Sequence, residues 1–517
     1  AGWRFAATPT GFIPAQDQGY LIGIIQMPPG STLERTDAVM QQATRIGRKI
    51  KGVHHIVAVA GLDGASFSNA PNAATVFLVL DDFKDRTAHH QTGDTIIADI
   101  RKDLGTIDAA NVLVVAPPPV RGIGTGGGFK MMVQDRQGLG ADKLQAATFD
   151  MMMAANKTPG LTSVFTLFNT GTPRIYADID REKAEQLGVT PDEVFSTLET
   201  YLGSSYVNDF NLFGRTFQVT AQADAQFRHS PSDIVNLKMR SASGAMVPIG
   251  SVATLRNAAG PYRVVRHNLF PAAELQGDTK PGFSSGQALA AMEQLAATHL
   301  PAGFGFEWTE LAFQEKSQGN TAGIVFALAV VFVYLLLAAQ YESLVLPFAV
   351  ILIVPMCLLA AILGVNLRGF DNNILTQIGL VVLVGLAAKN AILIVEFAKQ
   401  AEERGEDRWK AAESAARTRL RPILMTSFAF ILGVVPLVIA TGPGAEMRQA
   451  LGTAVFFGMI GVTLFGLLFT PVFYVIASWV TSKLPVRRLD EPDVGETAPP
   501  EPPAPPQLGT APAGDRA

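Results

Sequence analysis

The residues of this sequence with the clearest chemical potential are a lysine and an asparagine inside an apolar stretch. Lys389 and Asn390 lie near the middle of residues 374–397, which are otherwise mostly aliphatic or small. An ammonium at the centre of a bilayer costs from about 3 to more than 10 kcal/mol, so it normally faces other helices and pairs with a carboxylate. The functional interpretation of Lys389 is an ion relay. A fixed ion pair between helices, or a snorkelling lysine, is the structural alternative.

A carboxylate partner for Lys389 is missing from the other apolar stretches. Glu396 lies two helical turns further on, and Glu342 falls in a loop. We therefore expect the partner to come from outside this chain. Small residues around the lysine would let another helix approach closely: Gly385, Ala387, Ala388 and Ala391.

Hydroxyl and guanidinium groups follow in the next apolar stretch. Thr426 and Ser427 lie just beyond Arg419 and Arg421, and hydroxyls at such a place could pass protons along a wet path. Two alternatives remain open: hydroxyls often bond back to their own helix, and arginines at a boundary can simply fix topology.

Five apolar stretches are long enough to cross a membrane, which takes about 20 helical residues. They cover residues 323–340, 343–365, 374–397, 422–441 and 453–479, within a membrane region at 319–480. The connection 401–420 is rich in Arg and Lys, so the positive-inside rule places it in the cytoplasm. An odd number of spans then puts residues 1–320 on the other side.

The start of the sequence lacks an export signal, although roughly three hundred residues would have to be exported. We therefore expect a segment upstream, with residues 1–11 as the end of a preceding span. Trp3 and Arg4 suit an interfacial position. An ordinary disordered terminus is the alternative.

Composition narrows the possible functions. The sequence is 48% hydrophobic, 17% charged and carries a formal charge of −4, which fits a membrane protein and excludes a nucleic-acid binder. Its single cysteine, Cys357, rules out an intrachain disulfide. The glycine-rich segment 122–128 precedes an expected strand and lacks the helix of a nucleotide loop. We expect no metal site, no cofactor and no enzymatic centre.

The region before the membrane repeats one pattern. Apolar β-branched runs and amphipathic stretches follow the order β-α-β-β-α-β over residues 12–120, as in a split βαβ unit. The same order begins again at 121–172 and resumes at 261–318, interrupted by an inserted domain at 173–260. The predicted fold is therefore an α+β region with two ferredoxin-like subdomains and an insert, followed by an all-α bundle of five helices. Residues 481–517, rich in Pro and acidic residues, are predicted to form a disordered tail.

Several long motifs carry a family resemblance. Residues 385–399 (GLAAKNAILIVEFAK) and 419–427 (RLRPILMTS) resemble the resistance-nodulation-division efflux transporters of Gram-negative bacteria, closest to the exporters of hydrophobic and amphiphilic drugs. Residues 12–19 (FIPAQDQG), 203–210 (GSSYVNDF) and 430–437 (FILGVVPL) resemble them too.

The resemblance implies a homotrimeric, proton-driven drug exporter of the bacterial inner membrane. This chain resembles the second of its two halves, with residues 12–318 as periplasmic porter and docking subdomains and a cytoplasmic C-terminus. Lys389 would pair with two aspartates of the absent first half, and Asn390, Arg419 and Thr426 would belong to the same proton path. The implied partners are a periplasmic adaptor, an outer-membrane channel and hydrophobic drugs; the energy source is the proton gradient.

The resemblance also implies a drug pocket between the porter subdomains. Matching positions are Phe67, Phe77, Ile22 and Ile24, with Phe67 in a flexible segment, 61–72, that resembles the family's switch loop. Phe165 and Val115 stand where an Arg and a Phe are expected, which leaves the substrate range open. Ordinary core packing is the alternative for each aromatic residue.

Two other functions stay open from the sequence. The chain could be a structural or binding half that does not itself transport. It could also be a metal-ion exporter of the same superfamily, which would favour paired methionines; residues 151–153 are all Met but have no evident partner set.

Overall fold

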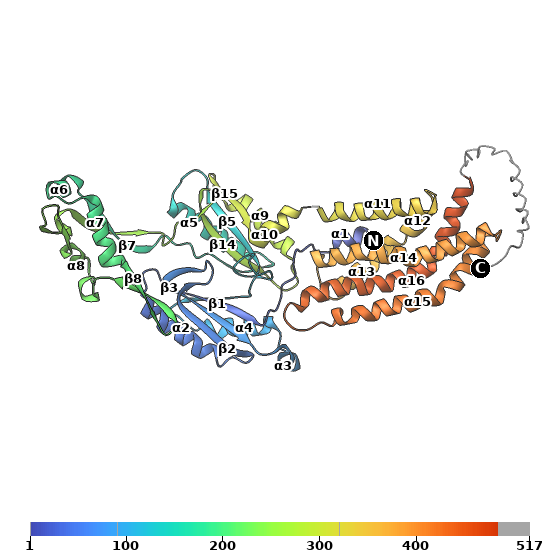
Figure 1. Ribbon diagram of the computed structural model, residues 1–517, viewed down its shortest axis with the longest axis horizontal. Coiled ribbons are helices and arrows are strands. Elements are labelled where there is room, and N and C mark those ends of the chain that lie inside the picture. Colours follow the sequence, from blue (N-terminus) through green and yellow to red (C-terminus); the bar gives the residue numbers. More distant parts are fainter. Residues whose placement is uncertain (1, 90, 320, 484–517) are drawn as a thin grey trace, which may run out of the picture.

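The computed structural model describes residues 2–89, 91–319 and 321–483. Figure 1 shows an elongated molecule with the insert at one end, two sheets in the middle and a bundle of long helices at the other end. The predicted mixed sheet and helix region followed by five apolar helices is confirmed. The predicted tail lies outside the described residues, except that 481–483 are helical.

The first unit is a four-stranded antiparallel sheet in the order β2-β3-β1-β4. Helices α2 and α4 bury an aliphatic core against one of its faces. Thr32 caps α2 by accepting the Arg35 amide at 3.4 Å. The elements are β1 (Tyr20–Gln26), α2 (Leu33–Gly47), β2 (Val53–Asp63), β3 (Ser68–Leu80), α3 (Phe83–Ala88), α4 (Gly93–Leu104) and β4 (Asn111–Val115).

The second unit repeats this strand order around an insertion. In its sheet, β14 lies between β6 and β5, and β15 pairs with the far side of β5. Helices α5 and α9 pack on one face of the sheet through Met151, Met292 and neighbouring apolar residues. The elements are β5 (Phe129–Asp135), α5 (Ala141–Lys157), β6 (Leu161–Phe165), β13 (Arg266–His267), β14 (Phe270–Thr279), α9 (Ser285–His299), β15 (Phe304–Thr309) and α10 (Glu310–Gln318).

The insert leaves and re-enters the second unit through the antiparallel pair β7 and β12. It has a small core of its own around Val194 and Ile249. The hairpin β8–β9 is exposed along almost its whole length. The elements are β7 (Thr172–Ile179), α6 (Arg181–Gln186), α7 (Pro191–Leu198), β8 (Ser205–Leu212), β9 (Arg215–Ala221), α8 (Pro231–Asn236), β10 (Lys238–Arg240), β11 (Met246–Pro248) and β12 (Ala253–Gly260).

The helical end contains five candidate spans, and the second is broken. Helix α12 stops at Ile351 and α13 starts at Val354, where Pro355 stands in the first turn and supplies no backbone N–H. The spans are built from α11 (Thr321–Tyr341), α12 (Leu346–Ile351), α13 (Val354–Leu367), α14 (Ile374–Glu403), α15 (Arg408–Val438) and α16 (Ala445–Lys483). The connection predicted at 401–420 is therefore mostly helical, with residues 404–407 between the two helices.

The N-terminal segment joins the sheets to the helical bundle. Helix α1 (Gly2–Ala7) precedes Thr8, whose hydroxyl accepts a hydrogen bond from Asn366 Nδ2 at 3.1 Å. Next, the Asn372 amide donates to the Pro9 carbonyl and the Ile374 amide to the Phe12 carbonyl. The start of the chain is thereby attached to the loop before α14.

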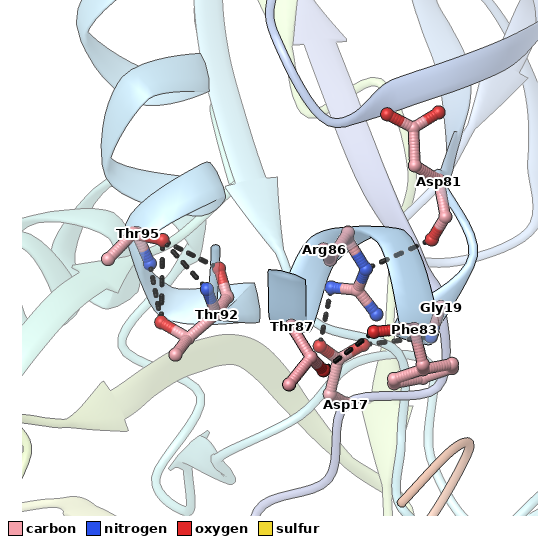
Figure 2. A network of polar contacts seen from close by, with 8 residues as sticks. All are labelled: Asp17, Gly19, Asp81, Phe83, Arg86, Thr87, Thr92 and Thr95. Carbon is pink, nitrogen blue, oxygen red and sulfur yellow. Dashed lines mark hydrogen bonds and ion pairs between the residues drawn. The ribbon is translucent and has the colours of Figure 1, made fainter. Parts of the chain in front are cut away.

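A buried ion pair makes a second attachment. Arg86 on α3 is 2% exposed, and its Nη1 lies 2.7 Å from Asp17 Oδ2 while its Nε donates to the Asp81 carbonyl. Figure 2 shows the Arg86 guanidinium between these two residues and next to the Phe83 ring. The Asp17 carbonyl also accepts the Gly444 amide at 3.2 Å, so the pair connects the first unit to the loop before α16.

Replacing Arg86 should therefore destabilise this end of the first unit. Arg86→Ala leaves the Asp17 carboxylate without its cation, and we expect a loss of about 3 kcal/mol. The exposed His54–Asp81 pair is the matched control, and His54→Ala should cost less than about 0.5 kcal/mol. Thermal unfolding of the purified protein in detergent measures both. Equal midpoints for the two variants would contradict the assignment.

A cavity of about 150 Å³ lies where the two units meet the helices. Phe12, Ser285, Glu315 and Asp371 are among the residues that line it. Burial raises the pKa of the Glu315 carboxyl from its ordinary 4.5 to about 7; the Ser285 hydroxyl opposes this rise, the Asp371 carboxylate adds to it, and Lys316 opposes it. The folded protein thus holds a proton on Glu315 that the unfolded chain releases above its ordinary pKa.

This proton makes stability depend on pH. Between pH 4.5 and about 7 the native state binds more protons at Glu315 than the unfolded state does, so stability falls as pH rises through this window. Glu315→Gln removes the titrating group, and we expect its melting temperature to decline less than that of the wild type across the same range. Parallel melting curves for the two proteins would refute the assignment.

Candidate functional site

Lys389 lies on an open face of α14. Its side chain is exposed, as are Ile378, Val382 and Gly385, which precede it at helical spacing. This stripe is apolar apart from the ammonium. Over residues 2–89, 91–319 and 321–483, no carboxylate lies within 4.0 Å of the Lys389 nitrogen. The open stripe therefore presents a membrane cation without a partner in the described part of the chain.

Asn390 points into the bundle instead. It is 5% exposed, and its Nδ2 donates to Ser427 Oγ on α15 at 3.1 Å. A buried amide and hydroxyl that satisfy each other join two helices where water is scarce. The structure therefore places Asn390 on a different side of α14 from Lys389, in a contact between helices. Its partner Ser427 is one of the two hydroxyl residues that the sequence analysis singled out.

Thr426 is exposed, and its hydroxyl donates to the Ile423 carbonyl of its own helix at 3.1 Å. Thr426 thus bonds back to its own helix, which is one of the two alternatives given above. Arg419 stacks over the Phe397 ring on α14, with its charged carbon 3.3 Å from the ring centre. Its buried Nε has no hydrogen-bond partner among the described residues.

These contacts fix the relative depth of the predicted relay residues. Asn390 and Ser427 are bonded, so their sequence neighbours Lys389 and Thr426 lie at about the same level. Arg419 and Phe397 are each about two turns further toward the 404–407 connection, roughly 10 Å at 1.5 Å per residue. The structure thus brings Lys389 and Thr426 to one level and puts Arg419 beyond them.

A larger cavity, of about 270 Å³, lies between the two sheet units. Its lining mixes aromatic and thioether groups with polar ones, which is typical of a site for amphiphilic molecules. The residues that line it include Met27, Asp63, Ser68, Asn72, Phe149, Met152, Phe165, Phe168, Tyr262, Arg263 and Glu274.

The six predicted pocket residues fall in three places. Phe165 lines the larger cavity. Ile22 and Ile24 are buried in a small apolar cluster on the sheet face away from α2 and α4, and Phe77 and Val115 pack against that cluster. Phe67 is 52% exposed at the tip of the β2–β3 hairpin, with a left-handed φ of 51°. Leu167 touches the apolar cluster and lines the cavity, so the two lie side by side.

The segment 61–72 forms the end of a β-hairpin. Strand β2 runs to Asp63 and β3 starts at Ser68, which leaves residues 64–67 as the turn. The Asp63 carboxylate accepts hydrogen bonds from the Ala65 amide and the Ser66 hydroxyl, and these contacts stabilise the turn. The sequence did not indicate this hairpin, because glycine, serine and asparagine are typical of both loops and hairpin turns.

Two charged cavity residues were missed. Arg263 and Glu274 come from segments far from the hairpin in sequence, and their side chains meet at 3.4 Å. Glu274 carried a usable signal, because a carboxylate within the otherwise apolar run 270–275 must have a partner.

The described residues hold no group of three or more His, Cys, Asp or Glu side chains that could bind a metal. Of residues 151–153, Met151 is buried in the core, Met153 is exposed and Met152 lines the larger cavity.

Comparison with known proteins gives the family. Residues 2–478 match the model of the AcrB/AcrD/AcrF family. The chain is 40% identical over 475 residues to the multidrug export protein AcrF of Escherichia coli K12, covering 91% of this chain and 46% of that protein. It is 39% identical to the multidrug/solvent efflux pump membrane transporter MepB of Pseudomonas putida, with 92% and 45% coverage, and 39% identical to the multidrug resistance protein MdtF of E. coli K12, with 91% and 46% coverage. The chain spans about half the length of these relatives. It therefore belongs to the AcrB/AcrD/AcrF family of resistance-nodulation-division multidrug efflux transporters.

Proposed function

We propose that this chain is the second half of a proton-driven exporter of hydrophobic and amphiphilic compounds in the bacterial inner membrane. The observation that carries the proposal is Lys389, an ammonium on an open apolar helix face without a carboxylate partner in the described residues. Relatives of about twice the length support a first half that packs on this face. Its intramembrane aspartates would supply the missing anions.

The chemistry follows from the cost of burying charge. With both aspartates ionised, the Lys389 ammonium is held between them; protonation removes their charge and releases it. Each proton that crosses a potential of 100 mV supplies about 2.3 kcal/mol, enough to bias helices between two arrangements. Thr426 lies at the depth of Lys389, and Arg419 lies nearer the basic end, where protons would leave toward the cytoplasm.

The substrate would bind in the cavity between the two sheet units, which act as porter subdomains. Phe149, Phe165 and Met152 offer apolar contact, while Asn72 and Arg263 offer polar anchors. Such a mixture suits molecules with an apolar body and a polar group.

The insert would face an outer-membrane channel, with an adaptor protein alongside. Its hairpin β8–β9 exposes Tyr206, Val207, Phe210 and Phe213, an apolar surface that supports packing against another copy in a homotrimer. No cofactor is needed, because the proton gradient supplies the energy.

Lys389 gives the sharpest test. In the assembled pump, Lys389→Ala should abolish proton-driven dye efflux, because nothing then competes with protons for the aspartates. Lys410→Ala on α15 is the matched control, since that lysine is exposed in the basic connection, and it should retain efflux. Size-exclusion chromatography should show an intact trimer for both. Normal drug resistance from Lys389→Ala at wild-type expression would defeat the proposal.

The need for a first half is tested separately. Expressed alone in a strain without its own pumps, the chain should give no energy-dependent dye efflux, because Lys389 lacks its anions. Co-expression with a first half that carries the intramembrane aspartates should restore efflux. If the chain alone pumps as well as a full-length homologue, the two-half mechanism is wrong. If co-expression restores nothing, the chain serves as a binding or structural half.

A further inference from the structure

The rim of the larger cavity is held by a segment from the other unit. The Tyr262 hydroxyl donates to the Asn69 carbonyl at 2.7 Å, and Arg263 Nη1 donates to Ser68 Oγ at 3.1 Å. Ser68 and Asn69 open strand β3, directly after the 64–67 turn. Ser68 also lines the cavity, so the residues after β12 hold its rim in place.

From Arg263 a series of opposite charges runs through the second unit. Arg263 Nη2 lies 3.4 Å from Glu274 Oε1, and Glu274 Oε2 lies 3.4 Å from Lys130 Nζ. Lys130 Nζ lies 3.1 Å from Glu310 Oε1. The Glu274 and Lys130 side chains are only 9% and 12% exposed, so solvent screens these charges weakly. We call Arg263, Glu274, Lys130 and Glu310 the charge chain.

Strand register explains why these residues meet. Lys130 on β5 is directly opposite Gln276 on β14, so Glu274, two residues along, is a diagonal neighbour on the same face. The helices α5 and α9 bury the other face through Met131 and Leu275. On the far side of β5, Lys130 is opposite Thr309, the residue before Glu310.

Glu310 is a strained residue at a junction. It is the first residue of α10, yet its φ is 57°, a value that residues other than glycine rarely adopt. The glycine-rich segment 122–128 leaves room for it, because a Cβ at Gly124 would lie 2.6 Å from Glu310 Oε2. Helix α10 ends at Gln318 and the first span, α11, begins at Thr321. The charge chain therefore ends at the start of α10, the helix that precedes the first span.

We infer that the charge chain couples the hairpin rim of the cavity to the start of α10, so that the position of α10 sets the shape of the cavity. Arg263 and Glu274 line the cavity, whereas Lys130 and Glu310 act through them as positioning residues. The effect of this coupling on substrate binding rests on the proposed function. The coupling itself can be measured without transport.

The test measures the mobility of the hairpin turn in variants that change the far end of the charge chain. Phe67→Cys places a nitroxide label at the exposed turn, and the native Cys357 is 1% exposed and buried from the reagent. The chain is purified with its first half, freed of cysteines, in lipid nanodiscs. Electron paramagnetic resonance should show a more mobile label in Lys130→Met and in the isosteric Glu310→Gln, although neither residue contacts the hairpin.

Glu307→Gln is the matched control, because Glu307 lies three residues before Glu310, on strand β15, but pairs with Arg136 and His267. It should leave the label spectrum unchanged, and Lys130→Arg should restore the wild-type spectrum. If Arg263→Gln mobilises the label but Glu310→Gln and Lys130→Met do not, the rim is held locally and the inference is wrong. Equal mobility in Glu307→Gln would also overturn it.

Efflux kinetics provide the second measurement. Glu310→Gln should raise the half-saturating dye concentration about threefold with little change in maximal rate, since partly exposed charge pairs contribute modestly. A lower maximal rate at an unchanged half-saturating concentration would contradict a role in shaping the cavity. If the unmodified pump moves no dye, the proposed function fails while the label spectra still decide the coupling.

Discussion

An ammonium in the middle of an apolar helix constrains everything packed around it. The other sides of α14 are closed in this chain, where Ala387, Ala388 and Ala391 are buried against neighbouring helices. The stripe through Val382, Gly385 and Lys389 remains open. A membrane lysine needs an anion at its own depth, so whatever covers this stripe must bring carboxylates to the level of the Asn390–Ser427 contact. The position of Lys389 thus sets the chemistry required of any helix that packs on this stripe.

Helices α14 and α15 are joined at two depths, and this determines how a change at Lys389 can spread. The Asn390–Ser427 hydrogen bond lies beside Lys389, and the Arg419–Phe397 stacking lies about two turns further on. Two separated contacts resist both sliding and rotation of one helix against the other. Neutralising the partner of Lys389 would therefore move the two helices as a unit, and Arg419 would move with them.

Sequence reasoning worked where one local property decides the outcome. Apolar length alone located the five spans, and apolar β-branched runs indicated the order of strands and helices before them. It failed where the outcome depends on distant partners. Ile22 and Ile24 alternate as strand residues should, but the pattern does not tell whether the face away from the helices opens on a cavity or closes on Phe77. The basic residues after α14 predict on which side of the membrane they lie, but they do not predict their backbone conformation. The sequence therefore did not indicate that most of 401–420 is helical. Nothing local to Arg263 indicates Ser68 or Glu274.

The proposed relay and the proposed substrate cavity lie in different parts of the molecule, so a transporter built this way needs a stiff connection between them. Helix α11 fits that role: Leu337 and Tyr341 fix one end in the bundle, while most of its length, including Ile324, Leu328 and Phe332, is exposed. Its other end follows α10 and Glu310. A helix anchored at one end transmits tilt to the other with little loss, because its backbone hydrogen bonds keep it straight. The charge chain then converts that tilt into a change at the hairpin, since separating Lys130 from Glu274 would leave two largely buried charges without partners.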